Sequence, residues 1–162
     1  MPESALLPVA LIWVVIGSLL SVIDIREHRL PDRIVLPMYP VVLAGLACAG
    51  VLGGQWAGWR ALACAALWLG AIGAVWLVSA GRAMGFGDVK LAPLLGATLG
   101  WVSWDAAVLG LLSCWLMGGC WALLLLLSGR ARMGTAIAFG PFMILGMWTG
   151  LLLVRLPVTT LV

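Results

Sequence analysis

Long apolar stretches, separated by short polar segments, run along almost the whole chain. Six of them can be marked, at residues 5–23, 34–52, 61–80, 83–101, 106–127 and 135–154. Each is about 20 residues long, the length that an α-helix needs to cross the hydrocarbon core of a bilayer. The pattern predicts an all-α, polytopic integral membrane protein with about six transmembrane helices.

The fourth stretch is the least regular, because its purely apolar part begins only at Leu91. Residues 91–104 make about 21 Å of helix, which is short of the roughly 30 Å hydrocarbon core. A helix that spans the membrane here must therefore start upstream. That start brings Gly87, Asp88 and Lys90 to the membrane boundary.

Composition agrees with this class. Hydrophobic residues make up 64% of the 162, charged residues 9%, and the mean hydropathy is +1.18, whereas a soluble domain carries about 25% charged residues. The lipid bilayer is thus an expected partner, and the length suits one transmembrane domain over residues 1–162. The net charge of +3 contains no dense basic run, so we expect no nucleic-acid partner.

The basic residues predict the orientation in the membrane. If the N-terminus lies outside, only Arg60 and Arg155 fall on the outer side. The other seven fall on the inner side: Arg26, Arg29, Arg33, Arg82, Lys90, Arg130 and Arg132. This excess predicts that residues 24–33, 81–90 and 128–134 face the cytoplasm. Four tryptophans then gather at the outer boundary, where indole rings are favoured: Trp56, Trp59, Trp101 and Trp104.

Cysteines and histidine give no reason to expect a metal or a cofactor. Cys48, Cys64, Cys114 and Cys120 lie in apolar stretches without a C-x-x-C pair, and we interpret them as buried, small apolar side chains. The single His28 lies among charged residues and is interpreted as a solvated loop residue. A structural zinc site is therefore not expected.

Two glycine pairs have the spacing that lets helices approach closely. They are Gly96-x-x-x-Gly100 and Gly146-x-x-x-Gly150. We interpret both as packing within the chain, with dimerisation as the weaker alternative.

Asp24 and Asp88 are the candidate chemical groups. Asp24 directly follows an uncharged stretch, and Asp88 precedes the short fourth one. Each alone could be an interfacial carboxylate that pairs with Arg26 or Lys90, because an ionisable group at membrane depth is costly unless something uses it. Two neighbouring carboxylates can share a proton, so that one activates water and the other protonates a peptide bond. Together they indicate amide hydrolysis.

The residues around Asp88 read Met84-Gly85-Phe86-Gly87-Asp88-Val89-Lys90-Leu91. A glycine on each side of Phe86 permits backbone conformations and close approaches that other residues cannot make. The alternative is a turn followed by an aspartate at a helix N-cap. A phosphate-binding loop is excluded, because no Walker lysine and hydroxyl follow.

The chain resembles the type IV prepilin peptidases, which are membrane aspartic peptidases. Gly85 to Leu91 resembles their G-x-G-D-x-K-L element. Asp24, followed seven residues later by Pro31 in a basic loop, resembles a second element, and Phe139-Gly140-Pro141-Phe142 resembles a third. The three occur in the family's order.

The resemblance implies leader cleavage of prepilin-like proteins at the cytoplasmic face of a bacterial cytoplasmic membrane, for pilus or type II-like secretion assembly. Asp24 and Asp88 would be the catalytic dyad, without a cofactor. The motif-supporting positions are Pro31, Gly85, Gly87 and Lys90. Longer family members also methylate the product, using an N-terminal region with paired C-x-x-C motifs. These 162 residues contain no such motifs, so methyl transfer is not implied.

Helix dipoles suggest how the dyad divides its work. Asp24 at the end of the first helix would hold the shared proton, and Asp88 at the start of the fourth would act as the base. Two alternatives remain open: an ion- or proton-coupled transporter subunit that uses both aspartates, and a catalytically silent assembly factor. The first predicts acids near mid-membrane and internal symmetry, and neither is evident in the sequence.

Overall fold

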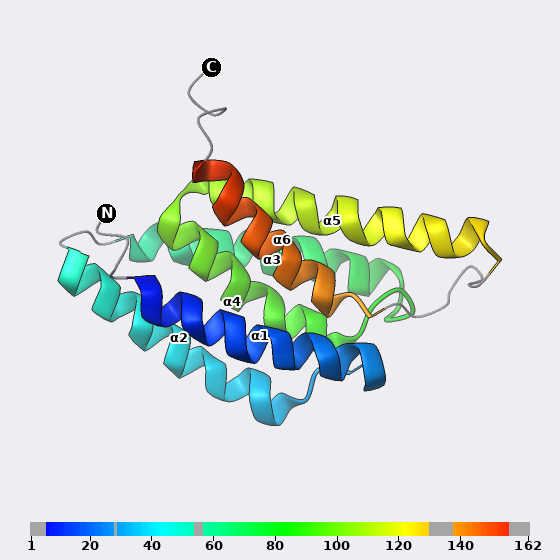
Figure 1. Cartoon of the computed structure of the whole chain (residues 1–162), viewed down its shortest axis with the longest axis horizontal. Coiled ribbons are helices and arrows are strands. Elements are labelled where there is room, and N and C mark those ends of the chain that lie inside the picture. The colour runs from blue at the N-terminus through cyan, green and yellow to red at the C-terminus, as the bar shows by residue number, and fades with distance from the viewer. Residues whose placement is uncertain (1–5, 28, 54–56, 130–137, 156–162) are drawn as a thin grey trace, which may run out of the picture.

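A computed structural model describes residues 6–27, 29–53, 57–129 and 138–155 of the chain. These ranges contain six helices and no strand. In chain order they are α1 (Leu7–Glu27), α2 (Asp32–Gly53), α3 (Gly58–Val78), α4 (Phe86–Val102), α5 (Trp104–Leu127) and α6 (Gly140–Arg155), shown in Figure 1. The predicted all-α fold is confirmed.

The helices run back and forth along the long axis of the molecule (Figure 1). The start of α1 and the end of α6 lie at one end of the bundle. The end of α1 and the start of α6 meet at the other end, together with the start of α4. The described parts of the connections that the sequence analysis placed in the cytoplasm therefore lie at one end of the bundle, which we call the site end.

Helix α4 occupies the centre, packed against α2, α3, α5 and α6. It is buried almost continuously from Asp88 to Trp101. This position explains its irregular pattern, because a helix surrounded by protein needs no lipid-facing stripe. Its observed start at Phe86 agrees with the predicted extension upstream of Leu91.

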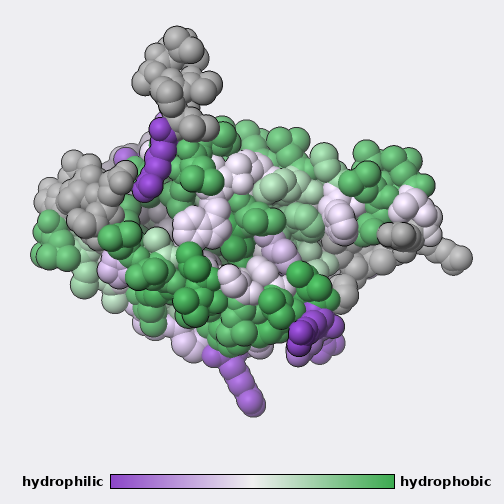
Figure 2. Space-filling view, viewed as in Figure 1, coloured by the Kyte–Doolittle hydropathy of each residue, from purple (hydrophilic) through white to green (hydrophobic). Residues whose placement is uncertain are grey.

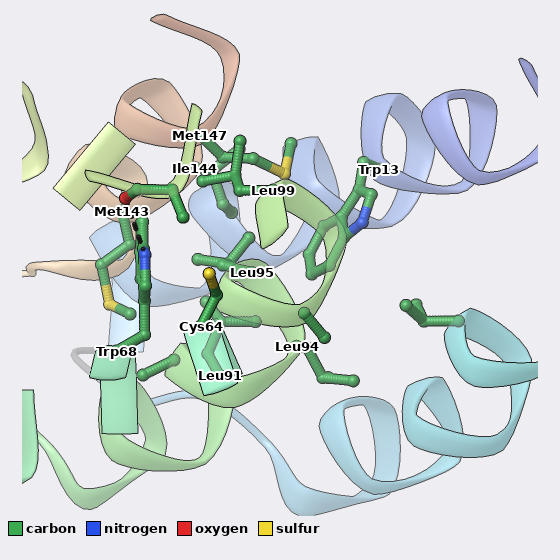
Figure 3. Packing of buried hydrophobic residues seen from close by; sticks show 14 of the residues in the cluster. Trp13, Cys64, Trp68, Leu91, Leu94, Leu95, Leu99, Met143, Ile144 and Met147 are labelled. Atoms are coloured by element: carbon green, nitrogen blue, oxygen red, sulfur yellow. Dashed lines mark hydrogen bonds between the residues drawn. The ribbon is translucent and has the colours of Figure 1, made fainter. Parts of the chain in front are cut away.

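Glycines set the closest helix contacts. A Cβ at Gly96 would collide with the carbonyl oxygen of Cys64 on α3, and a Cβ at Gly150 would lie 2.5 Å from the carbonyl oxygen of Ala106 on α5. Both predicted glycine pairs thus pack helices within the chain. Around them, large side chains fill the interior, and the Trp68 indole N–H donates to the Ala107 carbonyl at 3.0 Å (Figure 3).

The joint between α4 and α5 is a single residue, Ser103. Its backbone ends α4, and its hydroxyl oxygen caps α5 by accepting the N–H of Ala106 at 2.9 Å. From α3, Arg60 donates to the carbonyls of Gly100, Trp101 and Val102 at 2.6–3.0 Å. A cation at these terminal carbonyls satisfies the C-terminal end of α4.

The surface is the one expected of a polytopic membrane protein. Helices α1, α3 and α5 and residues 32–52 of α2 are long and apolar enough to cross a bilayer, and α6 is a shorter apolar helix. Apolar residues cover most of the face in Figure 2. Val51, Val78 and Leu127 are all more than 70% exposed, which water would not tolerate in such numbers but lipid does.

Most helix boundaries differ from the predicted ones by a few residues, and two of the differences affect the site. Helix α1 continues to Glu27, so Asp24 lies inside its last turn. Helix α6 begins at Gly140 instead of residue 135, and Ala138 and Phe139 are not helical. The cause of the later start is Pro141, whose missing N–H and fixed φ suit a first helical turn. Residues 135–137 are outside the described ranges.

Some predictions about single residues were wrong. Cys48 and Cys120 are exposed, whereas Cys64 and Cys114 are buried as expected. Trp101 lies at the end of α4, as the predicted boundary cluster requires, but its ring is buried, and Trp59 and Trp104 lie nearby in a tilted contact with ring centroids 5.8 Å apart. Uniformly apolar helices carry no periodic signal that tells the lipid-facing side from the packed side. Trp56 and His28 lie outside the described residues.

Candidate active site

Asp24 is buried where α1 meets α6. Its side chain lies in the last turn of α1 and the residue is 3% exposed. The backbone N–H of Gly140, the first residue of α6, donates to Asp24 Oδ2 at 2.9 Å. A Cβ at Gly140 would lie 2.8 Å from the same oxygen. Only glycine therefore lets the N-terminus of α6 approach this carboxylate so closely.

Asp88 is equally buried, in the first turn of α4. It is the third residue of the helix and 3% exposed. The N–H of Gly85, the N-cap, donates to Asp88 Oδ2 at 3.2 Å. This arrangement corrects the N-cap alternative, because Asp88 follows the cap by three residues and reaches back to it as the acid of a capping box does.

The second oxygen of Asp88 distinguishes it from a capping residue. Oδ1 is buried and has no hydrogen-bond partner among the described residues. A buried carboxylate oxygen without a donor is costly, so a structural cap alone does not explain it. Such an oxygen is free to bind a proton, a water molecule or a substrate group.

The fold brings these two side chains together from distant parts of the chain. The carboxyl groups of Asp24 and Asp88 are close enough to interact electrostatically. Within the described ranges they are also the only acidic side chains that are buried. The predicted pair is thus present at the site end, with one member on α1 and the other on α4.

Gly87 links the two aspartate elements physically. A Cβ at Gly87 would lie 2.7 Å from Leu30 Cβ and 3.1–3.2 Å from the backbone N and O of Leu30. The loop that follows Asp24 thus rests directly on the helix that carries Asp88. Gly85 needs no special backbone, since its φ of −75° is open to any residue. Of the two predicted advantages of glycine here, close approach at Gly87 is the one observed.

Lys90 and Pro31 fix the neighbouring helix α2. Lys90 Nζ lies 2.7 Å from Asp32 Oδ1, and the Tyr39 hydroxyl donates to the Lys90 carbonyl at 2.7 Å. Lys90 therefore pairs with Asp32 and not with Asp88. The Pro31 carbonyl accepts the N–H groups of Ile34 and Val35 and begins α2. Both motif positions support the site without entering it.

Sequence reasoning missed two contributors. The Gly140 N–H was not assigned to the site, although the Phe139-Gly140-Pro141-Phe142 element contained the signal, a glycine and a proline at a helix start. Asp32 was given no catalytic role, and its pairing with Lys90, which joins residues 58 positions apart, was not foreseen. Among the described residues, no group of three or more His, Cys, Asp or Glu side chains could hold a metal ion.

The fold and this site define a polytopic, all-α membrane protein with a buried pair of acids at one end of its helix bundle. The chain belongs to the type IV leader peptidase family, whose model matches residues 9–162.

Curated relatives agree with this assignment, and each is a prepilin leader peptidase/N-methyltransferase. The Escherichia coli K12 protein is 38% identical over 133 residues, which cover 78% of this chain and 55% of that protein. The Pseudomonas putida protein is 34% identical over 155 residues, covering 91% and 50%. The chain thus spans about half the length of these relatives. No solved structure matches it significantly.

Proposed function

We propose that this protein is an aspartic endopeptidase that removes leader peptides from prepilin-like proteins at the cytoplasmic face of the bacterial cytoplasmic membrane. The observation that carries the proposal is the burial of Asp24 and Asp88 at the same end of the bundle, close enough to interact electrostatically. The names of the relatives supply the substrate class. The seven-to-two distribution of basic residues supports the cytoplasmic location of that end.

The proposed reaction needs only the two carboxyl groups and one water molecule. The ionised carboxylate removes a proton from water, and the water oxygen bonds to the scissile carbonyl carbon. The protonated carboxyl group donates to the carbonyl oxygen. The C–N bond then breaks as the leaving nitrogen takes the proton that the first carboxylate removed from water, and a hydroxyl of the tetrahedral intermediate returns its proton to the second carboxylate. The products are a carboxylic acid and an amine, and the dyad is restored to its starting state. Burial keeps the carboxyl groups close to a fixed geometry between these steps.

The position of the pair suits a substrate that reaches it along the membrane. The aspartates lie at the ends of α1 and α4, where an apolar segment in the bilayer would join a leader in the cytoplasm. We treat residues 1–162 as one peptidase domain. A transporter pathway would require acids farther along the helices, near the bilayer centre, so we do not favour that alternative.

Cleavage of a prepilin in membranes tests the proposal. Asp24→Asn and Asp88→Asn should each lower the rate by about 10²–10⁴-fold, because an amide can neither take a proton from water nor carry the shared one. Combining them should lower it little further, because both disable one unit. Asp105→Asn is a matched control, since Asp105 is an exposed acid in the first turn of α5. Near wild-type cleavage by Asp88→Asn would refute the peptidase dyad.

A further inference from the structure

The start of α6 donates a hydrogen bond to the candidate dyad, and the proposed reaction assigns no role to this bond. The Gly140 N–H donates to Asp24 Oδ2 at 2.9 Å, across 116 residues of sequence. The N–H groups in a first helical turn have no partner within the helix. The bond to Asp24 therefore takes nothing from the hydrogen bonds of α6. It also brings the positive end of the α6 dipole to the carboxylate.

The two aspartates differ in the hydrogen bonds that their surroundings donate to a negatively charged carboxylate. Asp24 receives a short bond from Gly140 at a helix N-terminus. Asp88 receives a longer one from Gly85 at 3.2 Å, and its Oδ1 has no partner among the described residues. Hydrogen bonds to a carboxylate favour its ionised form, whereas an oxygen without a donor is best satisfied by carrying the proton itself.

We propose that Gly140 is a positioning residue whose backbone N–H orients Asp24 and holds it ionised, so that Asp24 is the base of the dyad and Asp88 carries the proton. This inference rests on the proposed peptidase function. It reverses the division expected from the sequence, which considered only the helix on which each aspartate lies. The sequence-based expectation did not include the N-terminus of α6, because Gly140 lies 116 residues from Asp24 in the chain.

Three described charged side chains lie close in sequence to the pair, on α1 and α4. On α1, Arg26 and Glu27 are exposed beyond Asp24. On α4, Lys90 pairs with Asp32 of α2. Among the described residues, the buried Cys114 thiol of α5 also interacts with Asp88. The only charged side chain on α6 is Arg155, at the opposite end of that helix.

An amide-to-ester replacement isolates the proposed bond. Glycolic acid in place of Gly140, introduced by nonsense suppression into the full chain in lipid nanodiscs, deletes the N–H and adds no atoms to the side chain. We expect kcat for prepilin cleavage to fall about 10- to 100-fold with little change in KM. The acid limb of the pH–rate profile should move to higher pH, because a carboxylate that has lost its hydrogen-bond donor binds a proton more tightly. A tenfold tighter binding of that proton moves the limb by about one pH unit.

Control replacements separate this role from a structural one. Gly58, the first residue of α3, receives the same ester and should keep the natural rate and profile. Gly140→Ala should also move the acid limb upward, since its Cβ would displace Asp24 Oδ2. Gly146→Ala, whose Cβ would lie 2.7 Å from Cys114 Cβ on the same α6, should reduce the amount of folded protein and leave the limb in place.

The outcomes are distinguishable from failure of the proposed function. If Asp24→Asn is inactive but the ester at position 140 keeps the natural kcat and pH profile, the inference is wrong and the peptidase dyad stands. A lower yield of folded ester protein with an unmoved acid limb also overturns the inference. If Asp24→Asn cleaves normally, the dyad itself is wrong.

Discussion

The contact between Gly87 and Leu30 can be tested by adding one methyl group. In Gly87→Ala, the new Cβ would lie 2.7 Å from Leu30 Cβ, whereas carbon atoms normally pack at about 3.5–4.0 Å. One side must therefore move by about 1 Å. The backbone N and O of Leu30 are also within 3.1–3.2 Å, so the loop itself must shift, and a rotamer change cannot relieve the overlap.

That displacement acts on both stability and activity. Overpacking of this kind costs about 1–3 kcal/mol of unfolding free energy. A shift of about 1 Å at a catalytic site lowers the rate about 100-fold, and this loop joins the helix of Asp24 to α2. We therefore expect Gly87→Ala to reduce prepilin cleavage about 100-fold in protein that still inserts into the membrane.

The assay compares cleavage rate and thermal unfolding in detergent with those of a second alanine variant. Gly70→Ala is the matched control, because Gly70 lies on an exposed face of α3 and a Cβ there meets nothing within 4 Å. It should keep the natural rate and unfold at the same or a higher temperature. Wild-type cleavage and stability in Gly87→Ala would refute the argument that close approach explains this glycine.

Three further predictions concern the rest of the bundle. Arg60→Met should lower the unfolding free energy by about 2–3 kcal/mol, because the carbonyls that end α4 lose a charged donor. Arg60→Lys should recover only part of this stability, measured by thermal unfolding, because an ammonium group lacks the fork of donors that a guanidinium group has. In a variant without native cysteines, Arg29→Cys should react with impermeant maleimide only from the cytoplasmic side and Asp105→Cys only from outside, and the opposite pattern would contradict the orientation. Prepilin cleavage should persist in excess EDTA, since two carboxyl groups suffice for the proposed reaction; a loss that zinc restores would contradict the mechanism.

The fold could be predicted from the sequence because transmembrane helices consist of long runs of apolar residues. It predicted the helical class, the upstream start of the fourth helix, and packing within the chain by the glycine pairs. It could not say which side of each helix faces lipid, because nearly all sides are apolar. Cys48 and Cys120 were predicted to be buried and are exposed for that reason.

Only those site residues could be predicted whose immediate sequence neighbours mark them as unusual. Asp24 and Asp88 stood out because each is a charged residue beside an apolar run. The contacts of Gly140 with Asp24 and of Lys90 with Asp32 connect positions 116 and 58 residues apart. Such partners depend on how the helices pack in three dimensions, and a single sequence has no periodicity that encodes them.

The bond between α1 and α6 has a consequence for how the protein is made. The ribosome delivers α1 to the membrane first, and Gly140 becomes available only after five helices have been synthesised. Until then Asp24 lacks the donor that this bond supplies. A nascent chain that stalls before α6 can insert its earlier helices, yet its Asp24 lacks this partner. Completion of synthesis and completion of the site thus coincide, and a truncated chain in the membrane would not yet possess the finished site.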